Sequence, residues 1–265
     1  MIKLKQKVGD DMKQYEKLVE LGCFSLKDVM NELDISQTCA TYAIQKYLSL
    51  GYIERIRRDL YVAISIETKQ PVLSRYQIGS RLFSDSYISH HSAFEVFGYA
   101  NQVFYEVYVA TDTRFRDFVY NGVLYHRTDN KYKTETQTID GVTVSTIEQT
   151  VIESICDMEK IGGLEEILRC ILLIPSLNYK KILSVLEKYD NGYLYQKCGY
   201  IFEGLNYSLH LPDSFFDECK KHIPNAKRYL TKDHAGYVWH EKWKLYAPEN
   251  IDSIINKGVE TQDEI

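Results

Sequence analysis

The chain has 265 residues, a formal net charge of −5 and 45% hydrophobic residues. This length exceeds one typical domain, and the apolar content is sufficient for a sizeable core, which excludes a disordered chain. Apolar runs such as CILLI are far shorter than the roughly 20 residues of a membrane-spanning helix. No apolar stretch typical of a signal peptide follows the basic residues of the N-terminus, so we expect a soluble, cytoplasmic protein without membrane contact.

The charge is unevenly distributed along the chain. Residues 1–66 contain ten Lys and Arg against nine Asp and Glu, whereas the remaining residues contain 22 against 28. This balance excludes a protein that coats nucleic acid with its whole surface. If DNA is a partner, a local patch near the N-terminus must carry the contact.

Three helices are predicted within the first 51 residues. The first has apolar residues at helical spacing and stops at Gly22. The second, SLKDVMNEL, opens with Ser25 and Asp28 at the spacing of a capping box. The third, QTCATYAIQKYLSLG, is capped by Ser36 and ends at Gly51.

The third helix has two distinct faces. Its apolar residues recur at i, i+3, i+4, i+7 and i+8, a spacing that buries one face. The other face carries medium-length side chains that exchange hydrogen bonds: Gln37, Thr38, Thr41, Tyr42 and Gln45. Side chains of this kind reach base edges when a helix enters the major groove, so we expect these five to read DNA.

Two strand-like runs, YIERI and LYVAI, follow and are joined by a polar RRD turn, which predicts a hairpin. Three helices plus a hairpin predict a winged helix-turn-helix domain over residues 1–66. The wing of that fold lies along the phosphate backbone. The basic side chains predicted to bind DNA phosphate are Lys46, Arg55, Arg57 and Arg58. A winged helix that makes only protein contacts remains an alternative.

A polar stretch with Pro71 separates this unit from the rest of the chain. Strand-like runs then follow helical ones, among them VFYEVYVAT, DFVYNGVLYHRT and VTVST. From Ile147 onward the chain is mainly helical, and it closes with a strand-like piece, GYVWHEKWKLYAP. Short strands followed by packed helices predict a larger α+β C-terminal domain over residues 67–265 and an α+β fold class overall.

Several segments, taken in chain order, resemble one known family. They are RRDLYV, SHHSAFEVFGYA, STIEQTVIESICDMEKIGGLEEILRCI, YQKCGYIFE and WKLYAPENI. Over nearly the whole chain, this order resembles the antitoxin of the type IV abortive-infection toxin–antitoxin systems, the AbiEi-like family. Two positions depart from the family pattern: Asp59 replaces the wing glycine, and Gln149 stands in place of an arginine. Aspartate tolerates a left-handed turn better than most residues but less well than glycine.

The resemblance implies a transcriptional repressor that binds inverted repeats in the operator DNA upstream of its own operon, where two protomers can meet as a dimer. It also implies a C-terminal antitoxin domain. That domain counteracts a nucleotidyltransferase-type toxin of a phage-defence operon, without forming a stable complex with the toxin.

Two other functions stay open. In a DNA-tethered nuclease, Asp129 and an upstream carboxylate, Glu106 or Asp112, hold Mg²⁺ while Lys131 polarises the attacking water. Such triplets arise often by chance in a chain that is 26% charged, and no nucleophile elbow, phosphate-cradling glycine loop or dinucleotide fingerprint occurs, so we expect no enzyme activity. The other alternative is a ligand-responsive transcription regulator without a toxin.

Candidate metal ligands are scattered along the chain. His90 and His91 are adjacent on a predicted helix and point in different directions, and Cys219 with His222 lacks a second pair. The six cysteines form no CxxC motif and are expected as free thiols, so neither a metal nor a cofactor is predicted. Three basic pairs form either a patch or the solvent-exposed faces of helices: Lys180 with Lys181, Lys220 with Lys221, and Lys227 with Arg228.

Overall fold

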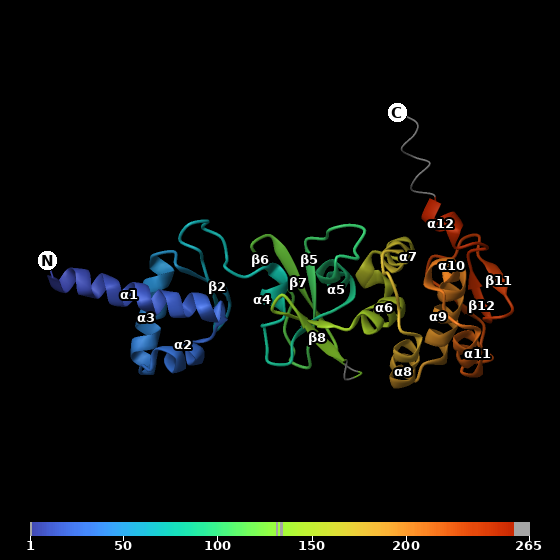
Figure 1. Ribbon diagram of the computed structural model, residues 1–265, viewed down its shortest axis with the longest axis horizontal. Coiled ribbons are helices and arrows are strands. Elements are labelled where there is room, and N and C mark those ends of the chain that lie inside the picture. The colour runs from blue at the N-terminus through green and yellow to red at the C-terminus, as the bar shows by residue number, and fades with distance from the viewer. Residues whose placement is uncertain (1, 131, 133–134, 257–265) are drawn as a thin grey trace, which may run out of the picture.

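The structure is a computed structural model that describes residues 2–130, 132 and 135–256. The fold is mixed α+β, and its elements follow one another along an elongated molecule (Figure 1). Helices with a small sheet form the N-terminal end, a six-stranded sheet lies in the middle, and helices with a second small sheet form the C-terminal end. No helix in the described part of the chain is long and apolar enough to cross a membrane.

The N-terminal unit combines three helices with a three-stranded antiparallel sheet. Its elements are α1 Ile2–Leu21, β1 Cys23–Phe24, α2 Leu26–Leu33, α3 Gln37–Ser49, β2 Ile53–Arg57 and β3 Leu60–Ala63. The strands pair in the order β1–β3–β2, so β1 extends the β2–β3 hairpin. Leu18 of α1, Val29 of α2 and Tyr47 of α3 are buried in one apolar cluster with Ile53 of β2. This cluster holds the helices against the sheet.

The helix caps and the hairpin turn follow local sequence signals. Ser25 and Asp28 form the predicted capping box, and Ser36 caps α3. Asp59 has a φ of 54° at the hairpin turn, a left-handed conformation that glycine adopts at the least cost. Its carboxylate accepts a hydrogen bond of 3.0 Å from the backbone N–H of Leu26. The aspartate therefore fixes the turn against α2, a contact that glycine cannot make.

A six-stranded mixed sheet forms the middle of the molecule. Its strands are β4 Tyr87–Ile88, β5 Glu106–Ala110, β6 Phe118–Tyr120, β7 Val123–Thr128, β8 Thr136–Ile139 and β9 Val142–Ser145, with helices α4 Arg75–Gly79 and α5 His90–Phe97. The strand order is β6–β7–β5–β4–β9–β8, in which β5 runs parallel to β7 and β4 to β9. Strands β5, β6, β7 and β9 lie within the strand-like runs of the sequence, whereas β4 and β8 were not predicted.

The C-terminal end is helical apart from a small sheet. Its helices are α6 Ile147–Cys156, η1 (a 3₁₀ helix) Met158–Ile161, α7 Leu164–Leu172, α8 Tyr179–Tyr189, α9 Gly192–Gly204, α10 Asn206–Leu209, α11 Asp213–Lys221 and α12 Asp252–Asn256. The strands are β10 Arg228–Tyr229, β11 Val238–His240 and β12 Leu245–Ala247, in the order β10–β12–β11. A Cβ atom at Gly199 of α9 would lie 2.1 Å from the ring of Trp243. Glycine is therefore required there for the buried indole to pack against the helix.

The β2–β3 hairpin contributes apolar side chains to two different clusters. One face contacts the N-terminal helices, while Ile56, Leu60 and Val62 belong to the apolar cluster of the six-stranded sheet. Tyr120 of β6 also donates a hydrogen bond of 2.7 Å to the carboxylate of Glu54. The hairpin is therefore held between the N-terminal helices and the central sheet.

Candidate nucleic-acid interface

The predicted base-reading residues lie together on one face of α3. All five are exposed and line one shallow depression of about 540 Å³: Gln37, Thr38, Thr41, Tyr42 and Gln45. Tyr42 is 73% exposed, which is unusual for a large aromatic side chain. The opposite face buries Ala40, Ile44 and Tyr47 in the N-terminal core. The structure thus gathers the five polar residues into one surface that can exchange hydrogen bonds.

Three of the four predicted phosphate-binding side chains lie at or near the surface. Arg55 and Arg58 of the hairpin are exposed, and the Nε of Arg55 donates a hydrogen bond of 3.1 Å to the carbonyl of Arg57. Lys46 is half-buried near the end of α3, with its Nζ 5.9 Å from the centroid of the Tyr47 ring. Both exposed guanidinium groups are accessible to an anion.

Arg57 is placed differently from its neighbours. Its guanidinium carbon lies 4.5 Å from the centroid of the Phe83 ring and 5.9 Å from that of Phe115. Its Nη1 is buried and has no hydrogen-bond partner among the described residues. Burial lowers the pKa of this guanidinium below its ordinary value. The predicted phosphate contact of Arg57 therefore lacks the exposure that Arg55 and Arg58 have.

The residues of the nuclease hypothesis are only partly brought together. Asp129 and Asp112 line one depression of about 480 Å³, where Arg127 pairs with Asp129 at 2.7 Å. Glu106 instead accepts a hydrogen bond of 3.0 Å from the hydroxyl of Tyr108, which lies on the same strand. Lys131 lies outside the described residues. Arg127 thus forms an ion pair with the carboxylate that this hypothesis assigns to Mg²⁺.

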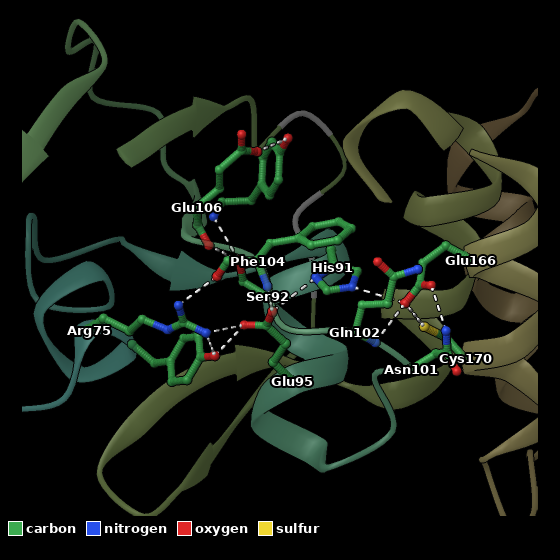
Figure 2. Close-up of polar contacts among 12 residues, drawn as sticks. Arg75, His91, Ser92, Glu95, Asn101, Gln102, Phe104, Glu106, Glu166 and Cys170 are labelled. Carbon is green, nitrogen blue, oxygen red and sulfur yellow. Dashed lines mark hydrogen bonds and ion pairs between the residues drawn. The ribbon is translucent and has the colours of Figure 1, made fainter. Parts of the chain in front are cut away.

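A buried polar network, absent from the sequence predictions, links α5 with α7. Figure 2 shows His91 between Glu95 and Glu166. The Nδ1 of His91 lies 3.2 Å from a carboxylate oxygen of Glu95, and its Nε2 lies 3.2 Å from one of Glu166. Arg75 pairs with Glu95 at 2.8 Å. Burial raises the pKa of Glu95, but the neighbouring His91 side chain and the hydrogen bond from the backbone N–H of Phe104 outweigh it and hold the pKa below its ordinary value. Two donors, His91 and Arg75, thus face two buried carboxylates.

The same network contains residue types that bind metals. The Nε2 of His91, a carboxylate oxygen of Glu166 and the Sγ of Cys170 all lie within 4.8 Å of one another. Glu166 also accepts hydrogen bonds from the Asn101 side chain at 3.1 Å and the Gln102 backbone N–H at 3.2 Å. Protein donors thus satisfy both carboxylate oxygens, and these contacts account for the cluster without an ion. The only sequence signal was the i, i+4 spacing of Glu166 and Cys170.

The other candidate metal ligands have separate surroundings. His90 directs its Nδ1 to the hydroxyl of Ser89 at 2.9 Å, away from the partners of His91. Cys219 is buried, whereas the ring of His222 stacks on Tyr195 with 4.5 Å between centroids. All six cysteines are free thiols, and three of them are buried.

The comparisons with known proteins show a shared fold and no more. No family model and no curated protein matches the chain. Among solved structures, the chain is similar to the crystal structure of the RV2827C protein from Mycobacterium tuberculosis, with a TM-score of 0.60 and 11% sequence identity. The match covers 93% of this chain and 95% of the mycobacterial one, so the similarity extends over both the N-terminal unit and the rest of the molecule.

Proposed function

We propose that the chain is a sequence-specific DNA-binding autorepressor and the antitoxin of a type IV abortive-infection toxin–antitoxin operon, acting in the cytoplasm. In this proposal residues 1–66 are a winged helix-turn-helix domain that binds inverted repeats in the operator, with two protomers meeting on the DNA. Residues 67–265 counteract a nucleotidyltransferase-type toxin without a stable complex.

The observation that carries the DNA-binding half is the exposed polar face of α3. Five side chains with hydrogen-bonding groups project from one helix whose opposite face is buried in the N-terminal core. The helix follows a capped α2 and precedes a hairpin with exposed Arg55 and Arg58. This order of elements supports a recognition helix beside a basic wing.

The antitoxin half is supported by the order of the sequence motifs over the whole chain. The segments that resemble the AbiEi-like family include the wing, the α5 segment, the α6–α7 segment and part of α9. The fold shared with the mycobacterial protein is compatible with this proposal but adds no information on function.

A gel-shift titration of the full chain on the DNA upstream of its own gene, at several salt concentrations, tests the DNA-binding half. Replacing Arg55 and Arg58 by alanine removes two phosphate contacts. Affinity should then fall on every sequence, and the slope of log affinity against log salt should become shallower by about 2. Replacing Thr41 by alanine should instead change which base pair is preferred.

Lys180 and Lys181 provide a matched control for the loss of charge. Both are exposed on α8, at the other end of the molecule from α3 (Figure 1). Their double alanine variant should bind DNA as the unaltered chain does. An equal loss of affinity in the two double variants would mean that net charge, not the wing, drives binding. Absence of any shift with the unaltered chain would refute the repressor half.

The antitoxin half has its own experiment. The proposal expects a nucleotidyltransferase gene next to the gene of this chain; the product of such a gene is expressed alone and together with the chain, and growth is measured. Co-expression should restore growth, and the Arg55→Ala, Arg58→Ala variant should restore it equally when both genes are under foreign promoters. Failure to restore growth would leave a transcription regulator without an antitoxin function.

A further inference from the structure

A cleft of about 970 Å³ is lined by residues of η1, the start of α7, α9 and the segment around β10, in the C-terminal part of the chain. This volume is at the upper end of the range for small-molecule sites. Basic and aromatic side chains line much of the cleft: Tyr193, Lys197, Lys227, Arg228, Tyr229 and Tyr237. None of them belongs to the predicted DNA-binding face.

Lys197 of α9 is a nearly buried cation, only 8% exposed. Its Nζ lies 3.4 Å from the carbonyl of Ile155 and 4.8 Å from the centroid of the Tyr193 ring, and no carboxylate oxygen lies within 4 Å among the described residues. Burial lowers the pKa of this ammonium below its ordinary value. A buried ammonium without a carboxylate partner destabilises the fold, and such groups concentrate at functional sites. An anion in the cleft would remove this cost.

Two further cations lie at the same cleft. The guanidinium carbon of Arg228 lies 5.8 Å from the centroid of the Tyr193 ring, and the Nζ of Lys227 lies 4.9 Å from the centroid of the Trp239 ring. In the part of the chain that the structure describes, neither has a carboxylate oxygen within 4 Å. Two of the three acidic residues that line the cleft already have cationic partners: Glu159 pairs with Lys232, and Asp157 pairs with Lys160. The cleft therefore keeps positive charge that the protein does not neutralise.

Aromatic rings adjoin these cations. The ring of Tyr229, 44% exposed, lies 4.2 Å from that of His234 and 4.8 Å from that of Tyr246, measured between centroids. The hydroxyl of Tyr193 donates a hydrogen bond to the carbonyl of Tyr229, which ties α9 to β10. Flat, partly exposed rings next to cations are the combination that stacks a base and holds its phosphate.

We propose that this cleft binds a free nucleoside phosphate, with the phosphate groups at Lys197 and Arg228 and the base beside the rings of Tyr193 and Tyr229. An inorganic anion would leave the rings unused, and an uncharged aromatic molecule would leave Lys197 uncompensated. The inference stands on the cleft alone and is independent of the proposed DNA binding.

Calorimetric titration of the full chain with ATP, GTP, CTP and UTP tests the proposal, with adenosine and tripolyphosphate as partial ligands. At least one triphosphate should bind tenfold more tightly than either partial ligand. Lys197→Met keeps the length of the side chain and removes its charge, so binding should weaken at least tenfold while the melting temperature holds or rises. Lys180→Met, on the exposed face of α8, is the matched control and should bind as the unaltered chain does.

Two exposed positions keep the test decisive if Lys197→Met does not fold. Arg228→Gln should weaken binding of both the triphosphate and tripolyphosphate, whereas Tyr229→Leu should weaken only that of the nucleotide. The proposal is overturned if no triphosphate binds, if tripolyphosphate binds as tightly as the best nucleotide, or if these variants bind unchanged. Binding of single-stranded RNA without binding of free nucleotides would also overturn it, because the cleft would then serve a polymer.

Discussion

Among single residues, Glu153 of α6 couples protonation to stability. Burial raises the pKa of this carboxyl to about 7, although hydrogen bonds from the backbone N–H of His90 at 3.0 Å and the hydroxyl of Ser145 at 2.9 Å oppose the shift. An exposed glutamate in the unfolded chain has a pKa near 4.5. Between pH 4.5 and about pH 7, the carboxyl of Glu153 therefore keeps its proton in the native state but loses it in the unfolded state. Stability falls as the pH rises through this window and levels off above pH 7.

Replacing Glu153 by glutamine isolates this effect, because the amide oxygen still accepts both hydrogen bonds but the side chain cannot ionise. The variant should gain stability over the unaltered chain as the pH rises from 5 to 8, reaching about 3 kcal/mol, since each pKa unit corresponds to about 1.4 kcal/mol. Urea denaturation at several pH values measures the difference. Glu187→Gln, on the exposed side of α8, should show no such trend. A difference between Glu153→Gln and the unaltered chain that stays constant with pH would contradict the assignment.

Sequence reasoning succeeded at exposed positions and failed at buried polar ones. The spacing of apolar residues in α3 was enough to predict which face is buried, so the exposure of Thr41 and Tyr42 could be predicted. Arg57 was predicted at the surface, and only the tertiary packing of Phe83 beneath the hairpin explains its position. His91 meets Glu166 across 75 residues of sequence, and no local pattern encodes that pairing.

At the scale of elements, the β2–β3 hairpin joins two parts of the molecule. The hydroxyl of Tyr120 in β6 donates to the carboxylate of Glu54 in β2 at 2.7 Å, 66 residues away in the sequence. Burial raises the pKa of this tyrosine well above its ordinary value, and the hydrogen bond to Glu54 adds to the effect. The phenol is therefore the donor of this hydrogen bond at neutral pH.

A double-mutant cycle with Tyr120→Phe and Glu54→Ala measures this link, because each change removes one partner of the hydrogen bond. Each single variant should lose stability. The double variant should lose about 1 kcal/mol less than the sum of the two single losses, a modest coupling because the carboxylate is partly exposed. Chemical denaturation of the four proteins provides the coupling. Losses that add without any coupling would mean that the contact between Tyr120 and Glu54 does not hold the hairpin to the sheet.

Whether an element could be predicted depended on its length and its patterning. Helices α2 and α3 carry caps and one apolar face, and the sequence predicted both ends of each. Strands β4 and β10 have two residues each, too few for an alternating pattern. Strand β8 is exposed along most of its length, so polar residues there give no strand signal. Strands β4 and β10 form through pairing with neighbours that are distant in sequence, whereas β8 pairs with β9 across the turn at Asp140 and Gly141.

At the scale of the whole molecule, the N-terminal unit and the central sheet share one apolar cluster. Ile56, Leu60, Val62 and Ile64 of the hairpin region are each at most 9% exposed and pack with residues of the six-stranded sheet. A chain cut after residue 66 would expose all four. Fully burying one such side chain contributes about 1.5–3 kcal/mol, which is a large part of the stability of a small domain. The predicted boundary at residue 66 thus follows hairpin residues that pack in one apolar cluster with residues of the central sheet.

Residues 1–66, produced alone, should therefore self-associate, which analytical ultracentrifugation measures. The pair Ile56→Thr and Leu60→Thr places β-branched residues at both positions of the hairpin and makes its exposed face polar, so it should restore a monomer. In the full chain the same pair should lower the melting temperature, because there it removes buried contacts. A monomeric, unaltered fragment would show instead that the hairpin face tolerates water. Since self-association can mask α3, a failure of the fragment to bind DNA would carry weight only with the threonine pair in place.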